Sequence, residues 1–138
     1  MYRLLPALLF FISCQSVKKM NWPERRSSLT GSDFYKQAAA MKWAARDSFA
    51  LKEILDGNVP EFLKKFIAIH VSVRDSSNGR QVRATYFVAP DYLATGTDQD
   101  WARINITPMA AQRIADSFQC FMSTRKIADD IYKAAKVK

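Results

Sequence analysis

The sequence predicts an α+β fold: a small antiparallel sheet built on one β-hairpin, packed with an N-terminal helix and a C-terminal helical pair. Apolar residues recur at every second position over residues 67–74, and the alternation resumes over 81–88, which is typical of half-buried strands. Before them, apolar residues recur every three or four positions after Thr30, and two more helix starts follow near residues 107 and 124. With 138 residues, the chain is long enough for one domain.

The hairpin is the best-defined element of this prediction. Asn78-Gly79 between the two alternating segments favours a two-residue turn, because both residues tolerate positive φ. Counting outward from that turn places one wholly apolar face on the hairpin and puts Arg74 directly opposite Arg83 on the other face.

The helices can be placed from their end signals. Thr30 to Asp33 resembles a capping box, so we expect one helix from there to about Leu55, with Gly57 as its left-handed cap. Asn58 would cap a short helix from Pro60 to Lys65.

After the hairpin, we expect a loop from Ala94 to Asp100 and a candidate third strand from Trp101 to Ile106. Thr107-Pro108 should start a helix over Met109–Phe118. Ser123 or Thr124 should cap the last helix.

The N-terminus has the pattern of an export leader. A short basic start precedes the apolar run Leu4–Ile12, which is too short to span a bilayer. Phe11-Ile12-Ser13-Cys14 resembles the lipobox of bacterial lipoproteins, whose Cys carries the lipid after cleavage. We therefore predict a signal peptide at 1–13, lipidation at Cys14, a basic tether at 14–29 and a single domain at 30–138. The alternatives are an ordinary secretory leader with an incidental Cys, or an N-terminal helix of the fold.

The charge is concentrated near the N-terminus. The chain carries a net charge of +8, but five basic side chains and only one acidic one lie in residues 1–30, so the rest carries +4. This mild excess, together with the leader, argues against a nucleic-acid partner.

Several stretches resemble a set of uncharacterised secreted bacterial proteins. The residues that carry the likeness are Gly57–Leu63, Ala84–Leu93, Thr107–Asp116 and Thr124–Tyr132. The resemblance implies export but no activity. It also implies that similar proteins continue past this point, and the last helix reaches Lys138 without a Gly, Asn or Pro stop. We therefore expect either a further C-terminal portion of this chain after Lys138 or a separate partner chain.

Few residues suggest chemistry. A dyad of His70 and Cys120 is conceivable, but no hydrolase motif surrounds Cys120, and a free Cys is more often a small buried hydrophobe. A Cys14–Cys120 disulfide is the other pairing, which lipidation would exclude. Asp98 and Asp100 are spaced like calcium ligands, yet loop solvation or capping of the next element explains them better. We predict no metal and no cofactor.

Arginines give the one candidate binding site. Two like charges directly opposed on a strand pair destabilise it unless an anion lies between them. Arg74 and Arg83, joined by Arg103 from the third strand, would suit a carboxylate or phosphate. The alternative is a solvated face, with Asp75 or Asp91 screening the pair.

These observations predict an exported envelope lipoprotein or secreted module of unknown ligand, non-enzymatic as it stands. Its partners would be the membrane, through the lipid anchor, and an anionic ligand or cell-wall fragment. The alternative is the N-terminal part of a secreted or envelope hydrolase whose catalytic residues lie beyond this chain.

Overall fold

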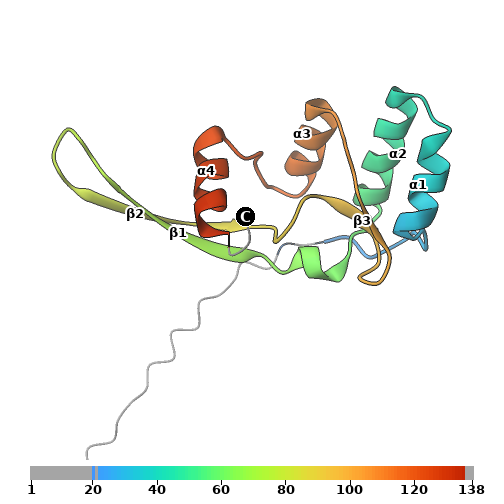
Figure 1. Cartoon of the computed structure of the whole chain (residues 1–138), viewed down its shortest axis with the longest axis horizontal. Coiled ribbons are helices and arrows are strands. Elements are labelled where there is room, and N and C mark those ends of the chain that lie inside the picture. The colour runs from blue at the N-terminus through green and yellow to red at the C-terminus, as the bar shows by residue number, and fades with distance from the viewer. Residues whose placement is uncertain (1–19, 21, 136–138) are drawn as a thin grey trace, which may run out of the picture.

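The computed structural model describes residue 20 and residues 22–135 (Figure 1). The helices and strands follow in this order: α1 (Gly31–Ala39), α2 (Trp43–Leu55), the 3₁₀ helix η1 (Glu61–Lys64), β1 (Ile67–Arg74), β2 (Gln81–Val88), β3 (Ala94–Gly96), β4 (Trp101–Arg103), α3 (Pro108–Ser117) and α4 (Arg125–Ala134). The predicted signal peptide and Cys14 lie outside the described residues.

The α+β class is confirmed, with the strands divided between two antiparallel sheets. One sheet is the hairpin of β1 and β2, and the other pairs β3 with β4. Helix α1 packs on β3 and β4, α3 packs on α2, and α4 packs on β1. The candidate third strand therefore exists, but its partner is β3 rather than the hairpin, and β3 lies in the segment predicted as a loop.

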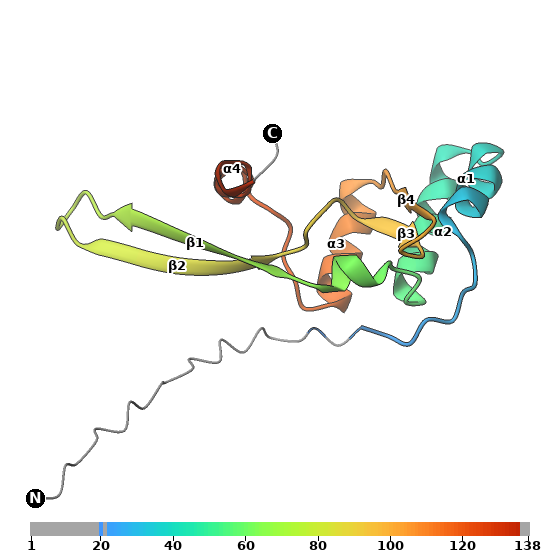
Figure 2. The ribbon, with the colours of Figure 1, turned by 60° about the horizontal axis from the view of Figure 1, so that its bottom comes forward.

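The main hydrophobic core lies between α1, α2, η1, the β3–β4 sheet and α3, which together form what we call the body. Its buried side chains are Phe34, Ala38, Ala50, Leu51, Ile54, Val59, Leu63, Ala94, Ala102, Ile104 and Ile114. No residue of β1 or β2 belongs to this cluster. Figures 1 and 2 show why: the hairpin extends away from the body as an arm, with α4 beside its near half.

The single helix predicted from Thr30 to Leu55 is two helices. Thr30 caps α1 as expected, with its hydroxyl accepting from the Asp33 amide at 3.2 Å. The chain then turns at residues 40–42, where Lys42 has extended backbone. The turn brings Phe34 onto Phe49 with ring centroids 5.0 Å apart. In one straight helix these two residues would stand about 22 Å apart along the axis, so burying both against each other requires the break.

The hairpin register differs from the predicted one by two residues. The loop spans residues 76–79 instead of Asn78-Gly79 alone, because the Asp75 carboxylate accepts bonds from the Ser77 amide at 2.9 Å and the Ser77 hydroxyl at 2.6 Å. The Asp75 amide donates to the Arg80 carbonyl at 2.8 Å and closes the wider loop.

Because a shift of two residues preserves the side-chain alternation, both predicted faces survive while the pairing changes. Arg74 lies opposite Gln81, and Arg83 lies opposite Ser72. The predicted direct pairing of Arg74 with Arg83 is therefore wrong: these two arginines are diagonal neighbours on one face.

Asn58 does not cap a helix; it is a buried residue that connects neighbouring segments by hydrogen bonds. Its side chain is fully buried and donates to the Leu29 carbonyl at 3.1 Å and to Glu53 Oε2 at 2.7 Å. Its own carbonyl accepts from the Thr95 hydroxyl at 2.8 Å. The cap position of η1 falls instead on Pro60. Asn58 thus ties together residue 29, α2 and β3 through its side-chain nitrogen and its main-chain carbonyl, whereas its buried side-chain oxygen has no hydrogen-bond partner among the described residues.

Part of the segment assigned to the tether packs on the body. Residues 22–29 form no helix or strand, but the Trp22 ring lies 4.6 Å from the Phe118 ring. The Arg26 amide donates to the Asp56 carbonyl at 2.9 Å, and the Arg25 guanidinium donates to the Gly96 carbonyl at 3.2 Å. Arg25 therefore has a structural role.

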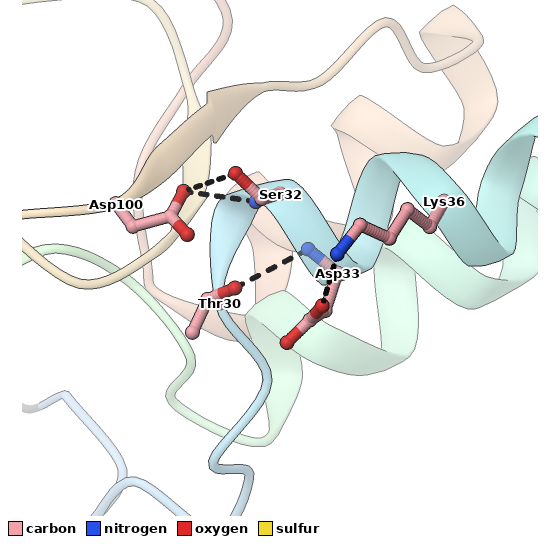
Figure 3. A network of polar contacts seen from close by, with 5 residues as sticks. All are labelled: Thr30, Ser32, Asp33, Lys36 and Asp100. Atoms are coloured by element: carbon pink, nitrogen blue, oxygen red, sulfur yellow. Dashed lines mark hydrogen bonds and ion pairs between the residues drawn. The ribbon is translucent and has the colours of Figure 1, made fainter.

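The β3–β4 turn is joined to the start of α1 by Asp100 (Figure 3). Its carboxylate accepts from the Ser32 amide at 2.9 Å and from the Ser32 hydroxyl at 3.0 Å, and its carbonyl accepts from the Gly31 amide at 2.9 Å. Asp100 therefore caps a helix, but that helix is α1, which precedes Asp100 in the chain, rather than the next element as predicted. Asp98 accepts from the Phe62 amide at 3.1 Å, so the two carboxylates serve different segments.

The two C-terminal helices begin where the sequence predicts. The Thr107 hydroxyl accepts from the Ala110 amide, and the Thr124 hydroxyl accepts from the Ile127 amide. Thr107 also donates its amide and hydroxyl to the Asp47 carboxylate, both at 2.8 Å, which fastens α3 to α2.

Candidate functional site

The three arginines predicted to share an anion do not come together. Arg74 and Arg83 lie on the outer half of the hairpin arm, whereas Arg103 ends β4 in the body. Figures 1 and 2 place the loop end of the hairpin and the β3–β4 sheet well apart in both views. The predicted three-arginine site is therefore wrong as a cluster, and its members need separate consideration.

Arg103 does border a cavity in the body, which we call the α1–β4 pocket. The pocket encloses about 400 Å³, within the usual size range of small-molecule sites. It is lined by Phe34, Tyr35, Ala38, Ala39, Arg46, Arg103, Ile104 and Asn105. Its lining is mostly apolar, and both charged residues in it are arginines. The pocket thus combines an apolar interior with positive charge at its edge.

Arg103 is held in place by several neighbours. Its Nη2 donates to both carboxylate oxygens of Asp91, at 3.1 and 2.8 Å. Its guanidinium carbon lies 5.7 Å from the centre of the Tyr92 ring and 5.4 Å from that of Trp101, within cation–π distance. On the pocket side, the Tyr35 hydroxyl donates to the Arg103 carbonyl at 2.8 Å.

The Arg103–Asp91 pair changes the pKa of both groups. The hydrogen bond from Arg103 lowers the pKa of the Asp91 carboxyl, against an opposing effect of burial. The hydrogen bond and the charge of Asp91 raise the pKa of Arg103. Because Asp91 already neutralises Arg103, this arginine positions neighbouring groups more than it offers free charge.

Arg46 supplies the available charge of the pocket. It lies in the first turns of α2, and its side chain makes no hydrogen bond or ion pair with any residue that the structure describes. Nothing in the sequence connects Arg46 with Arg103, because the two meet only through the turn between α1 and α2 and the position of β4. Sequence reasoning therefore missed it.

The arrangement suits a ligand with two parts. Phe34 and Ile104 are almost fully buried and form apolar walls, which favour an aliphatic or aromatic group. Arg46 contributes a planar guanidinium to the lining, and Asn105 an amide, both of which suit an acidic group. The pocket can therefore bind and orient a ligand.

His70 and Cys120 do not form a dyad. His70 Nδ1 lies 3.0 Å from the Thr85 hydroxyl on the hairpin, whereas the Cys120 thiol contacts Met20 Sδ at 3.1 Å. Burial raises the pKa of the Cys120 thiol, which disfavours the reactive thiolate. Within residues 20 and 22–135, Cys120 is a free cysteine, and no three His, Cys, Asp or Glu side chains gather as metal ligands.

Among the helices of the described residues, none is long and apolar enough to cross a bilayer. Comparison of the chain with protein-family models, with curated proteins and with solved structures found no match.

Proposed function

We propose that the protein is an exported module of the bacterial envelope that binds a small ligand carrying an acidic group on an apolar body. It is anchored by lipid at Cys14 and performs no catalysis itself. The observation that carries the binding function is the α1–β4 pocket, in which apolar walls lead to the unpaired guanidinium of Arg46. Fatty acids contain this combination of groups.

Export and anchoring are supported by the sequence. The apolar run Leu4–Ile12 ends at Ser13-Cys14, in the order that a lipoprotein leader requires. Mass spectrometry of protein from the membrane fraction should show loss of residues 1–13 and added acyl mass on Cys14. A Cys14→Ser variant should lose the acyl mass and leave the membrane fraction. A mature chain that still begins at Met1 would contradict the proposal.

The ligand-binding part can be tested with two probes of nearly equal shape. We expect 4-phenylbutanoate to bind in the pocket through its ring and its carboxylate, and the neutral 4-phenylbutanamide to bind through its ring alone. Calorimetric titration should show that Arg46→Gln weakens carboxylate binding by about tenfold and leaves amide binding unchanged, because only the carboxylate gains a charge-assisted bond.

Two further variants make this experiment decisive. Ala39→Trp should fill the pocket and abolish binding of both probes. Arg26→Gln removes an equal charge outside the pocket and should leave both affinities unchanged. If Arg46→Gln weakened both probes equally, or Ala39→Trp weakened neither, the α1–β4 pocket would not be the binding site.

A further inference from the structure

The hairpin arm extends beyond the part of it that the rest of the chain covers. Helix α4 packs on β1, and Ile69 is the only hairpin side chain that is fully buried, with 7% of its surface exposed. The loop end of the hairpin lies beyond α4 in both views of the ribbon (Figures 1 and 2). We call residues 71–84 the outer arm.

One face of the outer arm is aliphatic and open to solvent. Val73 lies directly opposite Val82, and the two are 49% and 52% exposed. Val71 lies opposite Ala84 on the same face, next to this pair. A single exposed valine is ordinary, but an adjoining group at the end of a projecting arm indicates a contact surface.

The outer arm is also positively charged. Arg74 and Arg83 lie diagonally on the opposite face, and Arg80 directly follows the loop. Arg74 donates to the Gly79 carbonyl at 3.2 Å, whereas Arg80 and Arg83 have no side-chain bond within the part of the chain that the structure describes. Asp75, the one carboxylate of this segment, is occupied by Ser77 and Asn78. Three guanidinium groups are thus left without a carboxylate.

These two properties together restrict the partner. A nucleic acid would use the arginines and leave the valines in water. A bilayer with anionic lipids offers an apolar boundary for the valines on one face of the arm, and headgroup phosphates nearer the water for the arginines on the other face. Both edges of a two-stranded hairpin carry unpaired backbone groups, which the hydrocarbon interior does not tolerate, so the arm must lie in the headgroup region.

We propose that the outer arm is a binding surface for an anionic lipid bilayer. Val71, Val73, Val82 and Ala84 face the acyl chains, while Arg74, Arg80 and Arg83 contact headgroup phosphates. This contact goes beyond the proposed function, because it needs neither the α1–β4 pocket nor acylation of Cys14.

A fluorophore on the arm reports this contact separately from any effect of the leader. In the full chain with Cys14→Ser and Cys120→Ser, Val82→Cys or Gln81→Cys is labelled with a nitrobenzoxadiazole dye. The two sites are adjacent but face opposite sides of the hairpin. Vesicles of phosphatidylcholine and phosphatidylglycerol should shift the emission to the blue at position 82 and much less at position 81. Pure phosphatidylcholine should give little change.

The charge requirement is tested in the same labelled chain. Arg74→Gln with Arg83→Gln should weaken binding to the anionic vesicles on the order of 20-fold, since each arginine near an anionic surface contributes about fivefold. The matched control, Arg26→Gln with Arg113→Gln, removes two arginines from outside the arm and should have a much smaller effect. Circular dichroism should show the same fold for both double variants.

Other occupants of the surface give different results. Equal emission changes at positions 81 and 82, or no change with anionic vesicles, would overturn the proposal. So would a shift at position 82 caused by DNA alone, or by raising the protein concentration without vesicles, since these results would identify a polyanion or a second copy as the partner.

Discussion

At the scale of single residues, Gly57 offers a sharp test of how the N-terminal segment packs. Its φ is +76°, and an added Cβ would come within 2.6 Å of the Pro23 carbonyl oxygen and 2.8 Å of that of Glu24. Gly79 has a similar φ of +70°, but its nearest neighbour would be the Arg74 side chain at 3.6 Å. The two glycines share a backbone penalty and differ in the steric one.

We expect Gly57→Ala to lower the free energy of unfolding by about 3 kcal/mol and Gly79→Ala by about 1 kcal/mol. The left-handed conformation costs an alanine about 1 kcal/mol, and the clash with two backbone carbonyls accounts for the rest. Urea denaturation of the full chain measures both values. Equal losses would mean that residues 23 and 24 do not lie against Gly57.

The residue scale also shows which part of the candidate site the sequence could predict. Arg103 was a predicted anion ligand, and it borders the α1–β4 pocket. Its actual neighbours are Asp91, Tyr92 and Trp101, which tertiary structure brings to it. Arg46 carried no local pattern that could mark it. A pocket formed between two neighbouring helices and a strand far from them in sequence leaves little trace in any one of these elements.

At the scale of elements, the hairpin illustrates what alternation can and cannot determine. The strand positions and both faces follow from the period of two, and they are confirmed. The register depends on the loop, where the Asp75 carboxylate selects a wider turn than Asn78-Gly79 alone would give. The sequence did not predict β3, because its three residues include a glycine and show no alternation of apolar and polar side chains.

Paired cysteines distinguish the two registers. Ser72 lies directly opposite Arg83, and directly opposed Cα atoms are about 4.5–5.5 Å apart, which suits a disulfide. Arg74 and Arg83 are diagonal, at about 7–8 Å, which does not. In a chain without Cys14 and Cys120, Ser72→Cys with Arg83→Cys should oxidise readily to an intramolecular disulfide.

The companion pair, Arg74→Cys with Arg83→Cys, should stay largely reduced under the same mild oxidant. Non-reducing electrophoresis and mass spectrometry of peptides read out both variants. Fast disulfide formation between positions 74 and 83, with slow formation between positions 72 and 83, would support the two-residue turn and contradict the wider loop.

At the scale of the whole molecule, the protein consists of a body with its own core and an arm held mainly by α4. The sequence predicted most of the helices and strands but not their separation into a body and an arm. The same apolar alternation fits a strand at the centre of a core and a strand outside it. The exposed fractions of Val73 and Val82 show that the core does not cover the outer part of this apolar face, although Ile69 on the same face is buried.

Carboxylates that accept hydrogen bonds in the folded chain should make the stability of the whole molecule depend on pH. Asp91 has a lowered pKa through its bond from Arg103, and Asp75 has one through its bonds from Ser77. The pKa of Asp100 is also lowered, because bonds from Thr30 and Ser32 outweigh an opposing effect of desolvation. Each carboxylate is thus more stable in its charged form in the folded chain than in the unfolded chain.

The sign of the effect follows from this difference. The stabilisation is fully present above the ordinary carboxyl pKa of 3.8 and is lost as the pH falls through the lower pKa of the folded state. We therefore expect the melting temperature to be nearly constant between about pH 5 and pH 8 and to fall steeply below about pH 4.

Asp91→Asn removes one of the titrating groups, so this variant should melt at a lower temperature than the original chain at pH 7 and lose less on acidification. Calorimetry of both chains at pH 7 and pH 3 tests this expectation, and an equal acid-induced loss in the two would show that the Arg103–Asp91 pair does not contribute to the stability of the fold.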